Sequence, residues 1–261
     1  MRSPWSFRGF SAPVVATAIH AGHDLRPSIA SRTALDDATR LREEDPFTDR
    51  LTAVAASTVV AHRSRFEVDL NRAREAAVYR VPDDAWGLEL WREPPSDADV
   101  ECSLQMYDEF YAELGRRLDA VAAIGPFVVL DLHSYNHRRD GSDMPEASTA
   151  ENPEVNVGTG SLDREGWAPV VDRFIDELGR REVRRHRLDV RENVRFRGGE
   201  LSRWVNERYA GRACALAIEC KKVFMDEWTG ELDERHIEEL RRALGAVVPA
   251  VIEELRCSAP R

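Results

Sequence analysis

Apolar runs that end in polar residues recur along this chain and predict the strands of a central sheet. Three of them, at residues 14–19, 127–132 and 213–218, contain few polar side chains. A strand consists almost entirely of apolar residues when helices cover both faces of its sheet. A short β-branched run at 57–62 predicts one more strand.

Amphipathic periods between these runs predict helices. Apolar residues recur at three- and four-residue spacing from Leu104 to Val121, and Gly125 and Pro126 follow as helix breakers. The polar, glycine-rich stretch 134–165 instead predicts a long functional loop. Further helices are expected at about 34–54 with a break near Pro46, and at about 167–181, 200–209 and 234–255.

This alternation of strands and helices predicts an α/β fold. The chain has 261 residues, and 43% of them are hydrophobic, which suffices for one large core and does not require a second domain. We therefore expect a single domain over residues 1–261, with about 1–12 as an N-terminal extension.

The charge of the chain limits its partners. It carries 47 acidic against 37 basic residues, and acidic residues are interleaved with nearly every arginine pair. Binding to nucleic acid needs clustered Lys and Arg, so no nucleic-acid partner is expected. We expect neither a signal peptide nor a membrane span, because no apolar run approaches roughly 18 residues. Four cysteines without short paired spacing fit a reducing cytoplasm.

Polar side chains follow the predicted strands at their carboxyl ends. His20 follows the first run, His133 follows 127–132, Glu219 follows the last run, and the acidic residues 43–45 open the next helical stretch. Ligands of open α/β sheets bind outside the carboxyl ends of the strands, so these groups are expected to converge. Two imidazoles and a carboxylate make a catalytic zinc set with a position open for water, and another carboxylate supplies a base. The residues therefore predict a zinc-dependent hydrolase of amide bonds.

The two histidines and the acidic run also have plainer interpretations. A lone histidine such as His20 is more often packed or exposed than a ligand, and His133 would then be satisfied by backbone. Acidic residues at 43–45 would be stabilised by the dipole of a helix N-terminus. In favour of a metal site, Asp131 and Ser134 flank His133 and are placed to fix its tautomer.

Glu219 ends the most apolar strand of the C-terminal half. A carboxylate at that position should be partly desolvated, which raises its pKa toward the range of a general base. The alternative is a structural ion pair with Lys221 or Lys222.

The segment 65–72 adds cationic groups to the set. Arg65 and Arg72 are suited to bidentate capture of a carboxylate or to stabilising an oxyanion, with Asn71 between them. On composition alone they are ordinary surface arginines.

Four motifs and a late acidic residue occur in a definite order. They are His-x-Gly from His20, Glu-x-Asp-x-x-x-Asp from Glu43, Ser-Arg-Phe-x-x-Asp-Leu-Asn-Arg over 64–72, Asp-Leu-His-Ser over 131–134, and Glu219. This order resembles the N-formylglutamate amidohydrolase (deformylase) family, which is related to the zinc carboxypeptidases and to aspartoacylase. The resemblance covers about residues 13–225. It implies a three-layer α/β/α domain with a mixed, mostly parallel central sheet, as in the zinc exopeptidases.

The resemblance also implies a set of zinc ligands. His20 and His133 would bind the ion, and Asp45 would complete the site as the second acid of the acidic motif. Aspartoacylase-like enzymes place a carboxylate three residues after the first histidine, where this chain departs from the pattern. The rivals of Asp45 are Glu44, His23 and Asp24.

Catalytic and substrate-binding roles follow from the same resemblance. Glu219 would activate the metal-bound water as general base, and Arg72 or Arg65 would stabilise the oxyanion or hold a substrate carboxylate. Substrate contacts are expected from Arg65, Asn71, Arg72, Ser134, Gly158 and Thr159.

The implied reaction is zinc-dependent hydrolysis of an N-formyl acidic amino acid. N-formyl-L-glutamate would give formate and L-glutamate, as in histidine degradation, and the partner would be a small molecule that carries a carboxylate. Two alternatives stay open: a related zinc-dependent amidase or carboxypeptidase with another substrate, and a non-catalytic α/β binding protein. The sequence indicates nothing about oligomeric state.

Overall fold

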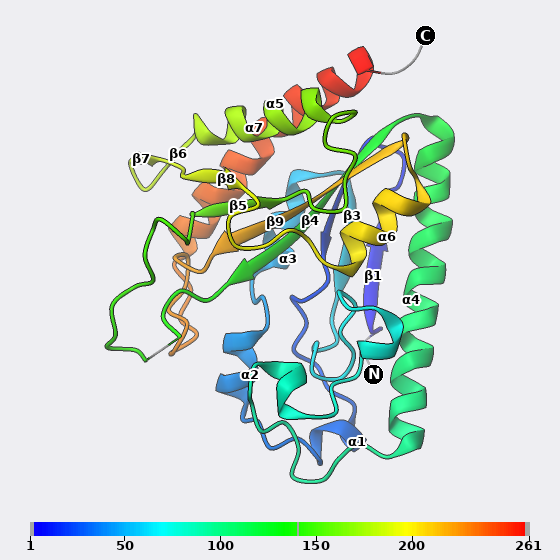
Figure 1. The fold of residues 1–261 in the computed structure, drawn as a ribbon, viewed down its shortest axis with the longest axis vertical. Coiled ribbons are helices and arrows are strands. Elements are labelled where there is room, and N and C mark those ends of the chain that lie inside the picture. Colours follow the sequence, from blue (N-terminus) through cyan, green and yellow to red (C-terminus); the bar gives the residue numbers. More distant parts are fainter. Residues whose placement is uncertain (1–2, 140, 259–261) are drawn as a thin grey trace.

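A seven-stranded sheet forms the centre of the computed structural model, which describes residues 3–139 and 141–258 (Figure 1). The strand order is β1-β3-β2-β4-β9-β5-β8. The strands are β1 (Trp5–Arg8), β2 (Val14–Ala18), β3 (Ser57–Ala61), β4 (Phe127–Tyr135), β5 (Val155–Gly158), β8 (Val190–Glu192) and β9 (Ala213–Lys221).

The four central strands, β3, β2, β4 and β9, run parallel to one another. Both flanks reverse direction, because β1 pairs antiparallel with β3 and β5 pairs antiparallel with β9. β8 then lies parallel to β5. The mixed, mostly parallel sheet expected from the resemblance is confirmed.

Seven helices are described in addition to the sheet. The two long ones are α4 (Asp97–Ile124) and α7 (Glu234–Ser258), and a small two-stranded sheet pairs β6 (Glu182–Val183) with β7 (His186–Arg187). The others are α1 (Pro27–Ala30), α2 (Asp37–Glu43), α3 (Thr48–Leu51), α5 (Ala168–Gly179) and α6 (Glu200–Arg208), with 3-10 turns at Thr52–Val54, Arg74–Ala76 and Pro82–Ala85. Within the residues described, no helix combines the length and apolar character needed to cross a membrane.

Helices cover both faces of the sheet, which gives the predicted three layers (Figure 1). Alternate residues of a strand point to opposite faces. Val129 therefore packs in one cluster with residues of α4 and α6, whereas Val128 and Leu130 pack in another with residues of α5 and α7. The central strands read as continuously apolar because both of their faces are buried.

Two sequence predictions about these elements need correction. The stretch 134–165 is not one loop, because β4 continues to Tyr135 and β5 lies within it. Residues 5–8 of the N-terminal stretch are the edge strand β1. Only four residues form each of β1 and β5, too few for a clear hydrophobic period.

The acidic residues 43–45 do not open a helix. Glu43 is the last residue of α2 and Glu44 is its C-cap, and the N-terminus of α2 is capped by Asp36, which accepts from the Thr39 amide at 2.7 Å. The helix-dipole explanation of this cluster is therefore wrong, because these carboxylates lie at the negative end of α2.

His133 and Glu219 lie within strands and do not follow them. They face each other in the register of β4 and β9, which continues two residues further to Tyr135 and Lys221. The apolar pattern stops at Leu132 and Ile218, where side chains begin to face the site, but backbone pairing does not stop there.

Candidate metal centre and active site

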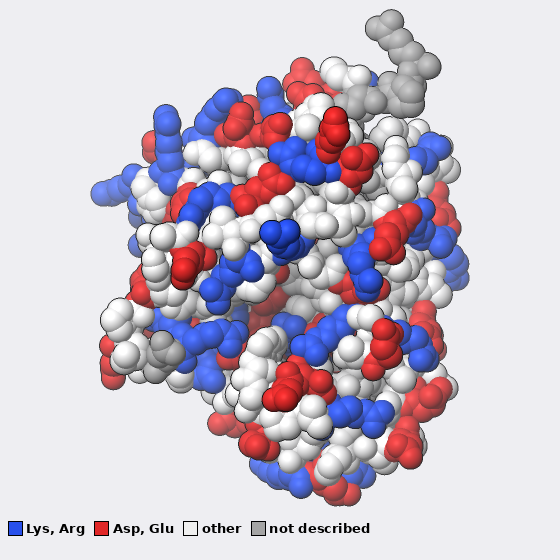
Figure 2. All heavy atoms as spheres, in the orientation of Figure 1, with Lys and Arg blue, Asp and Glu red and all other residues white. Residues whose placement is uncertain are grey.

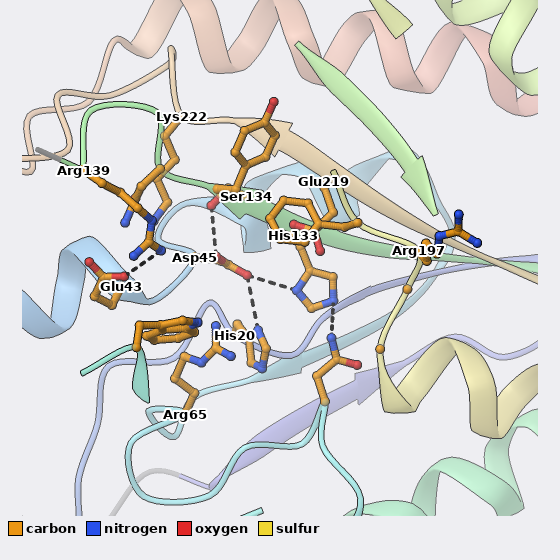
Figure 3. Close-up of a pocket in the computed structure, with 17 residues that line it drawn as sticks. His20, Glu43, Asp45, Arg65, His133, Ser134, Arg139, Arg197, Glu219 and Lys222 are labelled. Carbon is orange, nitrogen blue, oxygen red and sulfur yellow. Dashed lines mark hydrogen bonds and ion pairs between the residues drawn. The ribbon is translucent and has the colours of Figure 1, made fainter. Parts of the chain in front are cut away.

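Three buried side chains meet near the carboxyl ends of the central strands (Figure 3). His20 follows β2, Asp45 lies between α2 and α3, and His133 is in β4. The Asp45 Oδ2 atom lies 3.0 Å from His133 Nδ1 and 3.4 Å from His20 Nδ1. Each residue offers one ligand atom, and these atoms lie within 4.8 Å of one another. Two imidazole nitrogens and one carboxylate oxygen are a donor set suited to a transition metal such as zinc.

The outer nitrogen of each histidine faces a second buried carboxylate. His20 Nε2 lies 2.7 Å from Asp69 Oδ1, and His133 Nε2 lies 3.1 Å from Asp131 Oδ2. Asp131 is itself held by the Thr17 hydroxyl, which donates to Oδ1 at 2.7 Å. Carboxylates in this position fix the ring orientation and tautomer of metal-binding histidines. Both Nδ1 atoms are thus aimed at Asp45, and the residues present fit a bound metal ion.

The charge states within the triad differ from those in water. Burial would raise the pKa of Asp45, but hydrogen bonds from His133 and His20 outweigh it and hold the pKa well below its usual range. Burial would lower the pKa of His133, but the charge of Asp131 outweighs it and raises the pKa well above the ordinary value. The structure therefore keeps Asp45 ionised, as a metal ligand must be.

Glu219 lies beside the triad, opposite His133 in the neighbouring strand. Burial raises its pKa to about 7, within the range useful for a general base. The alternative of an ion pair with a following lysine finds no support, because the Lys221 ammonium pairs with Glu146 at 3.6 Å and that of Lys222 donates to backbone carbonyls.

A cavity of about 230 Å³ opens over the triad and Glu219. Of the predicted substrate-binding residues, Arg65, Asn71 and Ser134 line it. The other lining residues are Glu43, Trp86, Tyr135, Asn136, Arg139, Phe196, Arg197, Gly198, Gly199 and Lys222.

Arg65 is anchored by the same carboxylate that holds His20. Its Nη2 atom lies 2.8 Å from Asp69 Oδ2, and its Nε donates to the Tyr79 hydroxyl at 3.2 Å. Its guanidinium also lies over the ring of Trp86, 4.9 Å from the centroid. The guanidinium therefore has a defined orientation at the edge of the cavity.

Asn71 and Ser134 line the cavity and also form hydrogen bonds with the residues around it. The Asn71 Oδ1 atom accepts from the Leu201 amide at 3.1 Å at the start of α6, and its Nδ2 lies 3.4 Å from His133 Nε2. The Ser134 hydroxyl donates to Asp45 Oδ1 at 3.2 Å. Both side chains thus support the groups that surround the triad.

Three other predicted residues lie outside the cavity lining. The Arg72 guanidinium donates to the Asp84 carbonyl at 2.6 Å and lies over the Tyr79 ring. Gly158 ends β5 and is packed so closely that a Cβ atom would come within 2.7 Å of the Gly198 nitrogen. The Thr159 hydroxyl donates to Glu192. The structure does not bring these residues together with the triad, and their roles stay predictions.

The rivals of Asp45 are occupied elsewhere or exposed. His23 Nδ1 lies 2.5 Å from Glu44 Oε2, and the Ser64 hydroxyl donates to the other oxygen of Glu44. Asp24 is exposed. Among the residues described, the acid that joins His20 and His133 is Asp45.

Sequence reasoning missed Asp69 as the partner of His20, and it missed Trp86 and Arg139 as cavity residues, whereas Glu43 belongs to the acidic run that was expected at the site. Asp131 was identified because it flanks His133 in the sequence, and the structure places both side chains on the same face of β4. No such local signal connects Asp69 with His20, because 49 positions separate them.

The fold and the site together define an α/β protein with a buried His-Asp-His candidate metal centre at the carboxyl edge of its sheet. The family model described as N-formylglutamate amidohydrolase matches residues 12–225, so the chain belongs to this family.

Individual relatives agree along nearly the whole chain. The chain is 24% identical to the N-formylglutamate deformylase of Pseudomonas aeruginosa over 269 residues, which cover 96% of this chain and 95% of the relative. The structure of an N-formylglutamate amidohydrolase from Ralstonia eutropha JMP134 superposes with a TM-score of 0.72 at 19% identity, covering 97% of this chain and 98% of that one. A gene product of Agrobacterium tumefaciens gives a TM-score of 0.65 at 14% identity, covering 98% and 96%. These two structures support the fold.

Proposed function

We propose that this protein is a zinc-dependent amidohydrolase that converts N-formyl-L-glutamate to formate and L-glutamate. The observation that carries the proposal is the buried His20, Asp45 and His133 triad, with Glu219 beside it in one cavity. The membership of the chain in the N-formylglutamate amidohydrolase family and its curated relative support the substrate.

His20, Asp45 and His133 would hold the metal. A zinc ion bound there would lower the pKa of water and polarise the scissile carbonyl. Asp69 and Asp131 would keep the two imidazoles oriented toward it.

Glu219 would carry the proton in this reaction. Its carboxylate takes a proton from the attacking water while the water oxygen bonds to the formyl carbon. The same proton then passes to the amide nitrogen as the C–N bond breaks, which releases the free amine and formic acid, and formic acid ionises to formate. A carboxyl group with a pKa of about 7 both accepts and donates a proton near neutral pH.

Arg65 would stabilise the negative charge that develops on the carbonyl oxygen. Its guanidinium is held in place by Asp69 and Tyr79 at the edge of the cavity. A preorganised donor of this kind is worth about 10²–10³ in rate. Two further cations that line the cavity, Arg139 and Arg197, favour a small substrate that carries carboxylates.

The experiment is to measure the metal content of the purified protein together with formate release from N-formyl-L-glutamate. We expect about one zinc per chain, loss of formate release after chelation, and recovery when zinc is restored. N-acetyl and peptidyl analogues run in parallel test the acyl group. Bound zinc with turnover of an analogue alone would refute the substrate, and absence of both metal and turnover would refute the proposed function.

A further inference from the structure

Lys222 places a buried ammonium next to the candidate metal centre. The residue directly follows β9 and is 1% exposed. Its Nζ donates to the backbone carbonyls of Arg42 and Glu44, each at 2.6 Å. These two carbonyls flank Glu43, and the second belongs to the residue just before Asp45. The Lys222 side chain is thus hydrogen-bonded to the backbone of the segment that carries Asp45, the candidate acidic ligand.

A buried positive charge at this position is unfavourable, because burial removes the water that would solvate the Lys222 ammonium. Burial lowers the pKa of Lys222, opposed by the charges of Asp45, Glu43 and Glu227. Within the described part of the chain, the structure records hydrogen bonds from Lys222 to carbonyls but no ion pair with a carboxylate. Buried ammonium groups without a close counter-ion are rarely tolerated, because desolvation disfavours the charge. Its two charge-assisted hydrogen bonds to backbone offset part of that cost.

The three consecutive carboxylates at residues 43–45 point in three different directions. Glu43 lines the cavity, and one of its carboxylate oxygens lies 3.1 Å from Arg139 Nη2. Glu44 turns to His23 and Ser64. Asp45 turns to the two histidines. Like charges in sequence repel one another, so this arrangement needs a backbone held in one conformation.

Two contacts fix that backbone from different strands. The Asp45 amide donates to the His20 carbonyl at 2.9 Å, which ties the segment to the end of β2. Lys222 ties the preceding residues to the end of β9. Within the segment, the Glu44 amide donates to the Arg40 carbonyl at 2.9 Å and the Thr48 hydroxyl donates to the Asp45 carbonyl at 2.7 Å. These local bonds do not join the segment to β9, and the Lys222 contact does.

We propose that Lys222 is a positioning residue for the metal centre, which fixes residues 42–45 so that the Asp45 carboxylate faces His20 and His133. This inference rests on the metal site of the proposed function. β9 then positions two groups, because the strand contains Glu219 and is followed directly by Lys222.

The test compares Lys222→Met with Lys221→Met. Met keeps a long unbranched side chain but has no N–H donor or charge. Lys221 is the matched control, because it is also a buried lysine at 4% exposure, it precedes Lys222 directly, and its ammonium pairs with Glu146 instead. Zinc affinity is measured by competition with a chromophoric chelator, at a temperature where both metal-free variants are folded. The absorption spectrum of the cobalt-loaded proteins reports the ligand geometry.

We expect Lys222→Met to weaken zinc binding by about 10–100-fold, the usual effect of removing a group that orients a ligand. Its cobalt spectrum should also change, while Lys221→Met retains wild-type affinity and spectrum. Wild-type affinity in Lys222→Met would overturn the proposal. A raised KM in that variant with unchanged zinc binding would likewise overturn it, because Lys222 would then serve the substrate.

If Lys222→Met does not fold, Lys222→Arg and Lys222→Gln decide the question. Arg retains a charged donor for both carbonyls and should bind zinc more tightly than Gln, and equal affinity in the two would overturn the proposal. The same measurements distinguish a failure of the proposed function from a failure of the Lys222 proposal. Wild-type protein that binds zinc without releasing formate refutes the reaction and leaves the Lys222 comparison valid, whereas wild-type protein that binds no metal refutes both.

Discussion

Asp69 and His20 are joined by a contact of 2.7 Å between a carboxylate oxygen and the outer ring nitrogen, in the interior of the protein. The other oxygen of Asp69 lies 2.8 Å from Arg65 Nη2. One carboxylate therefore orients both a candidate metal ligand and the guanidinium proposed to stabilise the oxyanion. The charge of Arg65 helps to hold the pKa of Asp69 well below its usual value against the effect of burial.

Asp69→Asn should therefore lower zinc affinity and kcat/KM together, each by about 10–100-fold. The amide retains the size of the side chain but removes the charge that orients His20 and Arg65. Zinc competition and steady-state kinetics measure the two effects, with Asp83→Asn on the exposed surface as control. Unchanged zinc affinity in Asp69→Asn would show that His20 does not depend on this carboxylate.

Glu219→Gln should lower kcat by about 10²–10⁴-fold, the usual contribution of a general base. Zinc binding should persist, because Glu219 is not a member of the triad. The measurement is formate release alongside zinc content. Glu231→Gln, a change at an exposed carboxylate, is the control. Full activity of Glu219→Gln would exclude the proposed proton transfer.

Gly199→Ala should destabilise the protein by about 1–3 kcal/mol, because an added methyl group is forced into a packed site. A Cβ atom at Gly199 would come within 2.4 Å of the Asn71 side chain, which caps α6 and approaches His133. Urea unfolding of the metal-free protein measures the loss. Gly125→Ala is the matched control, since no atom lies within 4 Å of its Cβ position, and an equal loss in both variants would contradict this reasoning.

His137 should make stability fall as the pH is lowered through the mildly acidic range. Burial lowers its pKa to about 4 in the folded protein, whereas the unfolded chain has the ordinary value of about 6.5. Between these two values the unfolded state binds the proton and the folded state does not. His137 therefore leaves the free energy of unfolding unchanged above about pH 6.5 and lowers it progressively as the pH falls toward 4.

Urea unfolding at pH 7.0 and pH 5.0 tests this effect. The loss of stability on acidification should be smaller in His137→Gln than in the wild type. His186→Gln is the control of opposite sign, because its hydrogen bond to Glu154 raises the pKa of His186. Equal acid sensitivity in wild type and His137→Gln would contradict the assignment.

The sequence by itself determined what depends on residues close together in the chain. The apolar runs indicated the central strands, and three- and four-residue spacing indicated α4, because burial of one helix face requires that period. Asp131 was linked to His133 because it flanks that residue in the sequence, and two-residue spacing does place the two side chains on one face of β4. The motif order along the chain also indicated the family that the comparison then established.

Tertiary structure alone decided how distant segments meet. Asp45 was one of four candidate acidic or histidine ligands until the fold turned Glu44 toward His23 and Asp45 toward His133, 88 positions away. Lys222 lies 178 positions from Glu44, and nothing local marks it as the anchor of that segment. A hydrophobic period records only whether a side chain faces the core. The partner of a buried polar group depends on strand order and register, which the whole chain must fold to establish.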